Sequence, residues 1–139
     1  MIPDFSMQRE ENLKLVQQLY RAFEQRDIPG LLDLLSPDID WLFYGPESIP
    51  FTGHYRGHAG VAEFFQKALD CTELLQIEPR EFSATQHNVL VEGHERGRAK
   101  ATGRDWETHW AHVFAIESGR IVRMREYYDT AVLVDAFAA

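Results

Sequence analysis

The first half of the chain has apolar residues three or four positions apart, the spacing that puts side chains on one face of a helix. In residues 12–24 these apolar positions are Leu13, Val16, Leu19, Tyr20 and Phe23. A shorter helix is predicted over residues 28–35, because Pro29 suits a first helical turn and Pro37 stops the helix. The helical spacing returns over residues 58–70 and predicts a third helix.

The second half has the two-residue alternation of β-strands. Strands are predicted over residues 38–45, 74–84, 88–103, 105–116 and 120–129, with a break at Pro79. Turns at 103–104 and 117–119 make the last three strands antiparallel neighbours. Helices followed by a meander of strands predict an α+β fold, with helices on one face of a curved sheet. Residues 1–139 are expected to form one domain, with residues 1–8 flexible.

The alternation in the strand at 88–103 separates a charged face from an apolar one. The charged face includes His94, which is expected in solvent. Glu95 falls on the apolar face, where Gly93 and Gly97 leave room above the sheet. Glu95 is therefore predicted to point inward.

The strand at 105–116 has an aromatic face with Trp110, His112 and Phe114 and a second face with Ala111 and Val113. The aromatic face is the better candidate for the interior, and the second face could pack against a partner subunit. A bulge in this strand would exchange the two faces.

The last strand places Glu126 on a mostly apolar face, where a bare carboxylate is costly unless it is paired or neutralised. If residues 117–119 form a three-residue loop, Trp110 pairs with Glu126, and His112 is a diagonal neighbour about 7–8 Å away at the backbone. Together with Glu95, these groups predict an aromatic pocket suited to acid-base chemistry on a small molecule. A structural network around Glu126 and a satisfied core position for His112 are the competing interpretations.

Eight further side chains are candidates to contact the ligand, because they are aromatic or flexible apolar residues. They are Tyr128, Trp110, Phe114, Met124, Trp41, Phe43, Tyr20 and Tyr55. Aromatic residues of this kind also fill ordinary cores, so core packing is the alternative for most of them.

Composition narrows the class of protein. The chain has 14 Lys and Arg against 22 Asp and Glu, and its net charge of −8 disfavours nucleic acid and anionic membranes as partners. The single Cys71 excludes an internal disulfide. His54 and His58 have no third ligand at a suitable spacing, so neither a metal nor an organic cofactor is expected. No secretory signal or membrane-spanning run is visible, which favours a cytoplasmic protein.

Three segments resemble the SnoaL-like branch of the nuclear transport factor 2-like superfamily. They are LYRAFEQRDIPGLLDLL, FTGHYRGHAGVAEFF and HVFAIESGRIVRMREYYDTAVL, in that order. The resemblance implies a cone-shaped α+β roll, in which three helices pack on a strongly bent, mixed-to-antiparallel sheet and enclose an apolar pocket. It also implies a homodimer formed through the sheet.

Within this superfamily, His112 resembles by chain position the protonated oxyanion-hole Asp of ketosteroid isomerases. Their catalytic base would fall near Phe43, which cannot accept a proton, and their oxyanion Tyr near Leu19, next to Tyr20. Steroid-isomerase chemistry in its usual form is therefore not expected.

The last strand also resembles that of limonene-type epoxide hydrolases, which have carboxylates at the places of Glu126 and Glu95. Gly93 stands where those enzymes carry the Arg that bridges the two acids. SnoaL-like cyclases, which use an acidic residue and a His on a polyketide, are compatible with the residues present.

We therefore expect a protein that binds a small apolar carbonyl- or ring-containing metabolite and catalyses proton transfer of the isomerase, cyclase or dehydratase type. Glu126 is expected to be the general base, His112 its partner acid and Glu95 a second carboxylate, with Tyr128 orienting the ligand. The alternatives are a non-catalytic ligand-binding or dimerisation module of the same fold, and an epoxide hydrolase in which another residue replaces the Arg.

Overall fold

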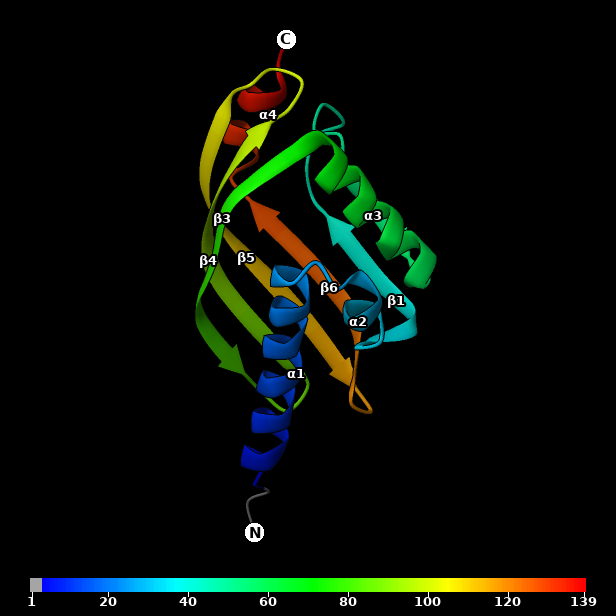
Figure 1. The fold of residues 1–139 in the computed structure, drawn as a ribbon. Coiled ribbons are helices and arrows are strands. Elements are labelled where there is room, and N and C mark those ends of the chain that lie inside the picture. Colours follow the sequence, from blue (N-terminus) through cyan, green and yellow to red (C-terminus); the bar gives the residue numbers. More distant parts are fainter. Residues whose placement is uncertain (1–3) are drawn as a thin grey trace.

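The computed structural model describes residues 4–139 as four helices and six strands. The helices are α1 (Ser6–Glu24), α2 (Ile28–Leu32), α3 (Gly57–Cys71) and α4 (Thr130–Phe137). The strands are β1 (Leu35–Phe43), β2 (Gly53–Arg56), β3 (Thr72–Ala84), β4 (Asn88–Ala99), β5 (Asp105–Glu117) and β6 (Arg120–Tyr128). In Figure 1, α1, α2 and α3 lie over one side of the curved sheet, and α4 lies at its end beside the turn between β4 and β5.

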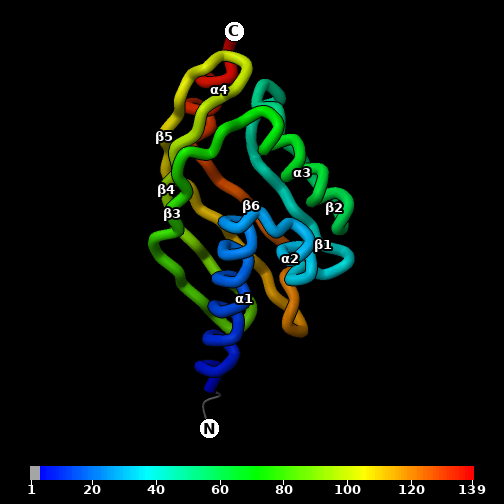
Figure 2. The backbone as a smooth tube through the Cα atoms, in the orientation of Figure 1, coloured from blue at the N-terminus to red at the C-terminus, as the bar shows by residue number. Residues whose placement is uncertain are grey.

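The six strands form one mixed sheet in the order β2-β1-β6-β5-β4-β3. β1 and β6 run parallel, and the other neighbouring strands are antiparallel. This arrangement confirms the α+β fold and the curved sheet. The sheet stays open, with β2 and β3 at its edges, and Figure 2 follows the chain from α3 directly into the edge strand β3.

Several predicted boundaries are wrong. β2 lies within a Gly- and Pro-rich connection where no strand was expected, and α4 was not foreseen. β3 runs through Pro79, although its pairing with β4 is irregular between Pro79 and Glu81, and an edge strand tolerates Pro because it needs to donate no ladder hydrogen bond on its open side. Residues 6–8, expected to be flexible, belong to α1, while residues 1–3 lie outside the described part of the chain.

The hairpin between β5 and β6 differs from the predicted register. Ser118 and Gly119 form a two-residue turn with φ values of 51° and 75°, and Glu117 pairs with Arg120. This turn alone would shift the register by one residue and reverse the faces of β6. An irregularity after the first pairs, where Val122 has no partner, adds a second residue to the shift and restores the faces.

The corrected register changes which residues pair across the hairpin. His112 pairs directly with Glu126 instead of diagonally, and Trp110 pairs with Tyr128. Ile121, expected on the outer face, is fully buried because it precedes the irregularity.

The outer face of the sheet also departs from expectation at His94, which is buried and not solvated. Its Nε2 lies 3.0 Å from a carboxylate oxygen of Glu107, and its ring packs against His109 with centroids 5.2 Å apart. Elsewhere on this face the exposed rings of Tyr44 and Tyr127 stack 4.9 Å apart. The homodimer expected through the sheet stays a prediction.

Within residues 4–139, none of the helices combines the length and apolar character needed to cross a membrane. The fold instead surrounds an interior lined by the concave face of the sheet. Packing of α1 and α3 on that face buries aromatic side chains from both helices and from β1, β5 and β6.

Candidate functional site

A cavity of about 80 Å³ lies between the helices and the concave face of the sheet. One water needs roughly 10–15 Å³ of such space, so several waters or a small organic group would fit. The lining is mostly aromatic and aliphatic, and its polar members are Tyr20, Thr72, Glu95, His112, Glu126 and Tyr128. The three residues predicted to be catalytic therefore meet at one cavity, although their chemical roles stay predictions.

Glu126 and His112 lie opposite each other because β6 and β5 pair at these two residues. The Oε1 atom of Glu126 is 3.4 Å from Nε2 of His112, and both side chains are almost completely buried. The other oxygen, Oε2, accepts a hydrogen bond of 3.1 Å from the indole nitrogen of Trp41 on β1.

Two tyrosine hydroxyls flank the His112 ring. The Oη of Tyr20, from α1, is 2.7 Å from Nδ1, and the Oη of Tyr128 is 3.2 Å from Nε2. The indole of Trp110 stacks on the imidazole with centroids 3.9 Å apart. The ring of His112 is therefore held on both edges and on one face.

The hydroxyl of Tyr128 connects His112 to Glu95. The Tyr128 hydroxyl donates a 3.1 Å hydrogen bond to Oε1 of Glu95, and the Trp106 indole donates a 3.2 Å bond to Oε2. Trp106 lies directly over Gly97, where a Cβ atom would collide with the indole. The room predicted above the glycines of β4 is thus filled by tryptophan rings, one of which holds Glu95 in place.

Burial shifts the ionisation of all three groups. It raises the pKa of Glu95 to about 7, although the hydrogen bonds from Trp106 and Tyr128 favour the ionised form. Burial raises the pKa of Glu126 well above its usual range, and the charge of Glu95 raises it further. Burial also lowers the pKa of His112 to about 3. Near neutral pH, Glu126 is protonated, His112 is neutral, and Glu95 is partly protonated and partly ionised.

These states give the hydrogen bonds a direction. Since the Tyr128 hydroxyl donates to Glu95, its oxygen accepts from Nε2–H of His112. Nδ1 of the neutral ring is then an acceptor, to which the Tyr20 hydroxyl donates. The chain of donors runs from Tyr20 through His112 and Tyr128 to Glu95. The proton of Glu126 takes no part in this chain of donors, and Glu126 lines the cavity.

Most of the predicted ligand contacts are in position. Tyr20, Trp41, Phe43, Phe114, Met124 and Tyr128 line the cavity. Trp110 does not line it, because the indole lies over Gly93 with His112 stacked on it. Tyr55 also lies outside the lining, since its hydroxyl donates to the backbone oxygen of Phe51 and its ring packs against α3.

Trp106 is a site residue that was not predicted. Alternation placed it on the inward face of β5, but nothing in the sequence shows that its N–H reaches Glu95 on the neighbouring strand. The pairing of Gly97 with Trp106 is the signal that could have shown this contact, because a glycine opposite an inward tryptophan lets the indole lie flat on the next strand.

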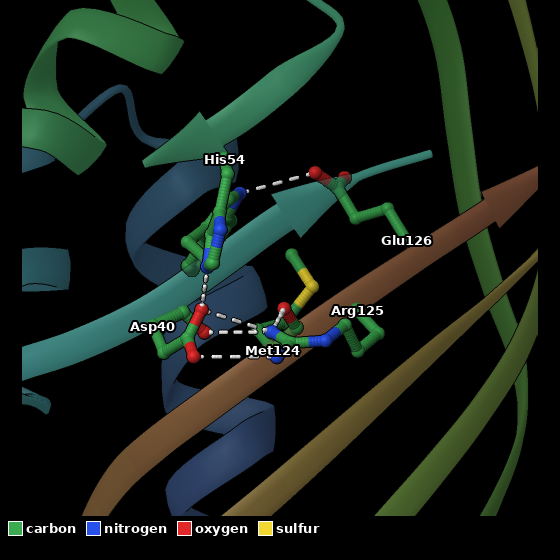
Figure 3. Close-up of polar contacts among 6 residues, drawn as sticks. Asp40, His54, Met124, Arg125 and Glu126 are labelled. Carbon is green, nitrogen blue, oxygen red and sulfur yellow. Dashed lines mark hydrogen bonds and ion pairs between the residues drawn. The ribbon is translucent and has the colours of Figure 1, made fainter. Parts of the chain in front are cut away.

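A second His–carboxylate pair lies outside the cavity, on β1 and β2. His54 Nε2 contacts Asp40, and Arg125 donates two hydrogen bonds to the same carboxylate, at 3.2 and 3.3 Å. Figure 3 shows Asp40 between His54 and Arg125, with Glu126 apart from this group. Among residues 4–139, no cluster of three or more His, Cys, Asp or Glu side chains is arranged to hold a metal ion.

Comparison with known proteins places the chain in a family. An NTF2-like protein from Burkholderia xenovorans is 35% identical, with 94% of this chain and 98% of that chain covered and a TM-score of 0.86. An NTF2-like protein of unknown function from Burkholderia pseudomallei is 30% identical, with 93% and 98% covered and a TM-score of 0.83. TerC, co-crystallised with polyporic acid, is 25% identical, with 93% and 99% covered and a TM-score of 0.81.

No curated protein matches this chain significantly. The family model of the SnoaL-like domain matches residues 16–124, which is most of the chain and includes Glu95 and His112 but not Glu126. The α+β architecture described above is that of the NTF2-like structures. The chain therefore belongs to the SnoaL-like domain family.

Proposed function

We propose that this protein binds a small apolar metabolite with a carbonyl group or a ring in the cavity and catalyses proton transfer on it, as an isomerase, cyclase or dehydratase does. One observation carries the proposal: two buried carboxyl groups line one aromatic cavity, and Glu95 accepts two hydrogen bonds that favour its ionised form where Glu126 accepts one. Different surroundings of two titratable groups are how active sites assign one acid and one base.

In this proposal Glu126 is the general acid and Glu95 the general base. Glu126 stays protonated and can donate to a carbonyl oxygen, whereas Glu95 titrates near neutral pH. These roles differ from the sequence-based expectation, in which Glu126 was the base. The change follows from the groups around each acid, because Glu95 accepts two hydrogen bonds that favour its ionised form, whereas Glu126 accepts one and its pKa is also raised by the charge of Glu95.

An isomerisation shows how the two acids would work together. Glu95 removes a proton from the carbon next to the carbonyl, and Glu126 gives its proton to the carbonyl oxygen, which yields an enol. Glu126 then recovers its proton from the enol oxygen, while Glu95 returns the other proton to a different carbon. Tyr128, held by neutral His112, donates to Glu95 and stabilises its ionised form.

The relatives support the choice of a small organic ligand. TerC shares the fold over nearly the whole length of both chains and was crystallised with polyporic acid. The aromatic lining of this cavity suits a ligand that presents a flat ring, since stacked and edge-on ring contacts are favourable.

The test compares Glu126→Gln and Glu95→Gln with the wild type on a panel of cyclic ketones and polyketide analogues, with binding and turnover measured separately. Both variants should bind ligands and lose turnover by about 100-fold or more. Glu92→Gln is the matched control, because Glu92 is an exposed residue of the same strand as Glu95. Undiminished turnover in either site variant would refute the assigned roles.

A non-catalytic binding module is the second candidate, and a specific observation favours it. Glu95, His112 and Glu126 all have partners within the protein, so the network is complete without a substrate. In that case the wild type and Glu126→Gln would bind the same ligands and neither would turn them over.

The epoxide hydrolase alternative gains no support from the described lining residues. Trp110 covers Gly93, the place expected for the bridging Arg, and neither Arg nor Lys is found among the residues that line the cavity.

A further inference from the structure

The polar side chains that line the cavity are acidic or neutral. Its polar lining residues are two carboxyl groups, three hydroxyl groups and one imidazole, and no Arg or Lys side chain lines it within the described chain. Burial keeps the imidazole of His112 neutral. The cavity thus has hydrogen-bond donors for an oxygen atom but no positive charge.

Cations near the lining residues are engaged outside the cavity, as Arg26 is over the Phe23 ring and with the Phe23 backbone oxygen. Lys100 donates to the backbone oxygen of Leu69 from an exposed position, and Lys67 pairs with Glu63 on the surface of α3. Arg125 follows the strand next to Glu126 but turns to the opposite face, where it binds Asp40. None of these cationic side chains lines the cavity.

An anionic ligand would therefore lose its hydration without gaining an ion pair. A buried charge that has no partner is strongly unfavourable. Ionised Glu95 would repel it as well, because like charges interact strongly where water is excluded. A neutral carbonyl compound avoids both penalties, and its oxygen can accept a hydrogen bond from the carboxylic O–H of Glu126.

We propose that the cavity selects uncharged ligands, such as ketones, esters and hydroxylated aromatic rings, and rejects the same carbon skeletons when they carry a carboxylate or a phosphate. This selection rests on the proposed function and narrows its substrate class. The ligand's acceptor oxygen faces Glu126, and its ring lies among the aromatic side chains, including Phe43 and Phe114.

The experiment measures the binding of matched pairs, each a methyl ester of a cyclic or aromatic keto acid and its free acid, at pH 8 by calorimetry. The wild type should bind each ester about 100-fold more tightly than the acid, because the acid is ionised at this pH. Lowering the pH towards the pKa of the ligand acid should reduce the difference.

Two variants test whether the missing cation causes the selection. Leu74→Arg introduces a positive charge at a half-buried lining residue of β3, and should reduce the ester preference by about tenfold or more. Leu75→Arg adds the same charge to the neighbouring residue, which is 41% exposed and outside the lining, and should leave the preference unchanged. Circular dichroism would check that both variants fold.

The outcomes separate this inference from the proposed function. Equal binding of ester and acid, or tighter binding of the acid, would overturn the selection while the binding site itself stands. An unchanged preference in folded Leu74→Arg would also overturn it. Failure of the wild type to bind any member of the pairs would refute the proposed function and the inference together.

Discussion

Two His–carboxylate pairs lie on opposite faces of the same sheet, and their surroundings make them different devices. His54 and Asp40 meet on the outer face in partial contact with water, beside the cation of Arg125. His112 and Glu126 meet in the cavity, where burial keeps both neutral. An imidazole and a carboxyl group thus lie beside an Arg cation on the outer face and form an uncharged pair in the cavity.

The two carboxyl groups respond to their surroundings in opposite directions. Burial opposes ionisation of Asp40, but the hydrogen bonds from His54 and Arg125 outweigh it and lower its pKa. For Glu126, burial is joined by repulsion from Glu95, and the pKa rises. The presence of a cation, rather than the identity of the acid, decides which state is stable.

The largest difference between the pairs should appear in turnover. We expect Glu126→Gln to reduce kcat by about 1,000-fold, because the amide cannot deliver a proton. Asp40→Asn should change kcat by less than about 2-fold, because Asp40 lies outside the cavity. Steady-state kinetics on any substrate found in the panel provide the measurement. A comparable loss in both variants would mean that the outer pair also serves the chemistry.

Glu95 and Asp40 should contribute to the pH dependence of stability with opposite signs. The pKa of Glu95 is raised to about 7, so the folded state binds its proton more tightly than the unfolded state does. The contribution of Glu95 to stability should therefore fall as pH rises from about 4.5 to 7, by roughly 3 kcal/mol. The pKa of His112 is lowered to about 3, so its contribution rises over the lower part of this range, and the raised pKa of Glu126 adds a fall of its own. The difference between the urea unfolding free energies of the wild type and Glu95→Gln, measured at several pH values, should isolate the Glu95 contribution.

Asp40 provides the contrasting case. Its pKa is lowered, so it stabilises the fold above its unfolded pKa and the contribution disappears as the solution becomes more acidic. Asp40→Asn should accordingly be less stable than the wild type at pH 7 and approach it at low pH. If Asp40→Asn and Glu95→Gln shifted the stability profile in the same direction, the contrast between the two faces would be wrong.

A smaller effect is expected from Tyr20→Phe. The variant removes the donor to Nδ1 of His112 and leaves this buried nitrogen without a partner, at a cost of about 1–2 kcal/mol in unfolding free energy. Nitrogen chemical shifts of the imidazole should show a mixture of tautomers in place of one. Tyr44→Phe, on the exposed outer face, is the control and should leave the imidazole signals as they are.

The smallest effect belongs to His54→Ala. His54 is partly exposed, and a polar contact at an exposed site contributes little, so the unfolding free energy should fall by less than about 1 kcal/mol. Thermal unfolding at pH 6 and pH 8 would measure it. A much larger loss would show that β2 depends on this contact for its place at the sheet edge.

Alternation along the strands was enough to predict the inward position of Glu95, His112 and Glu126, because the side to which a strand residue points is a local property. Alternation placed Trp110 correctly too, but it could not show that this side chain stays outside the cavity lining. This side chain does point inward, but the ring of His112 stacks on it and separates it from the cavity. Which inward residue reaches a void depends on neighbours from other strands, and no single strand contains that information.

The register of the hairpin between β5 and β6 could not be predicted from the sequence either. A three-residue loop and a two-residue turn followed by a bulge both fit the residues 117–119, and they differ only in backbone angles that Ser118 and Gly119 can adopt. His94 was misjudged for a similar reason, since its burial arises from packing against His109 on the next strand.

The irregularity at Val122 has a consequence for insertions and deletions in this protein. It offsets the one-residue register shift of the two-residue turn, so with this turn the irregularity keeps Glu126 on the concave side. Removing one residue at the hairpin tip while the irregularity stays would turn the acid towards water although no residue of the cavity had been altered. Deleting Val122 instead should remove the irregularity and leave the remaining pairs, including His112 with Glu126, in one regular register.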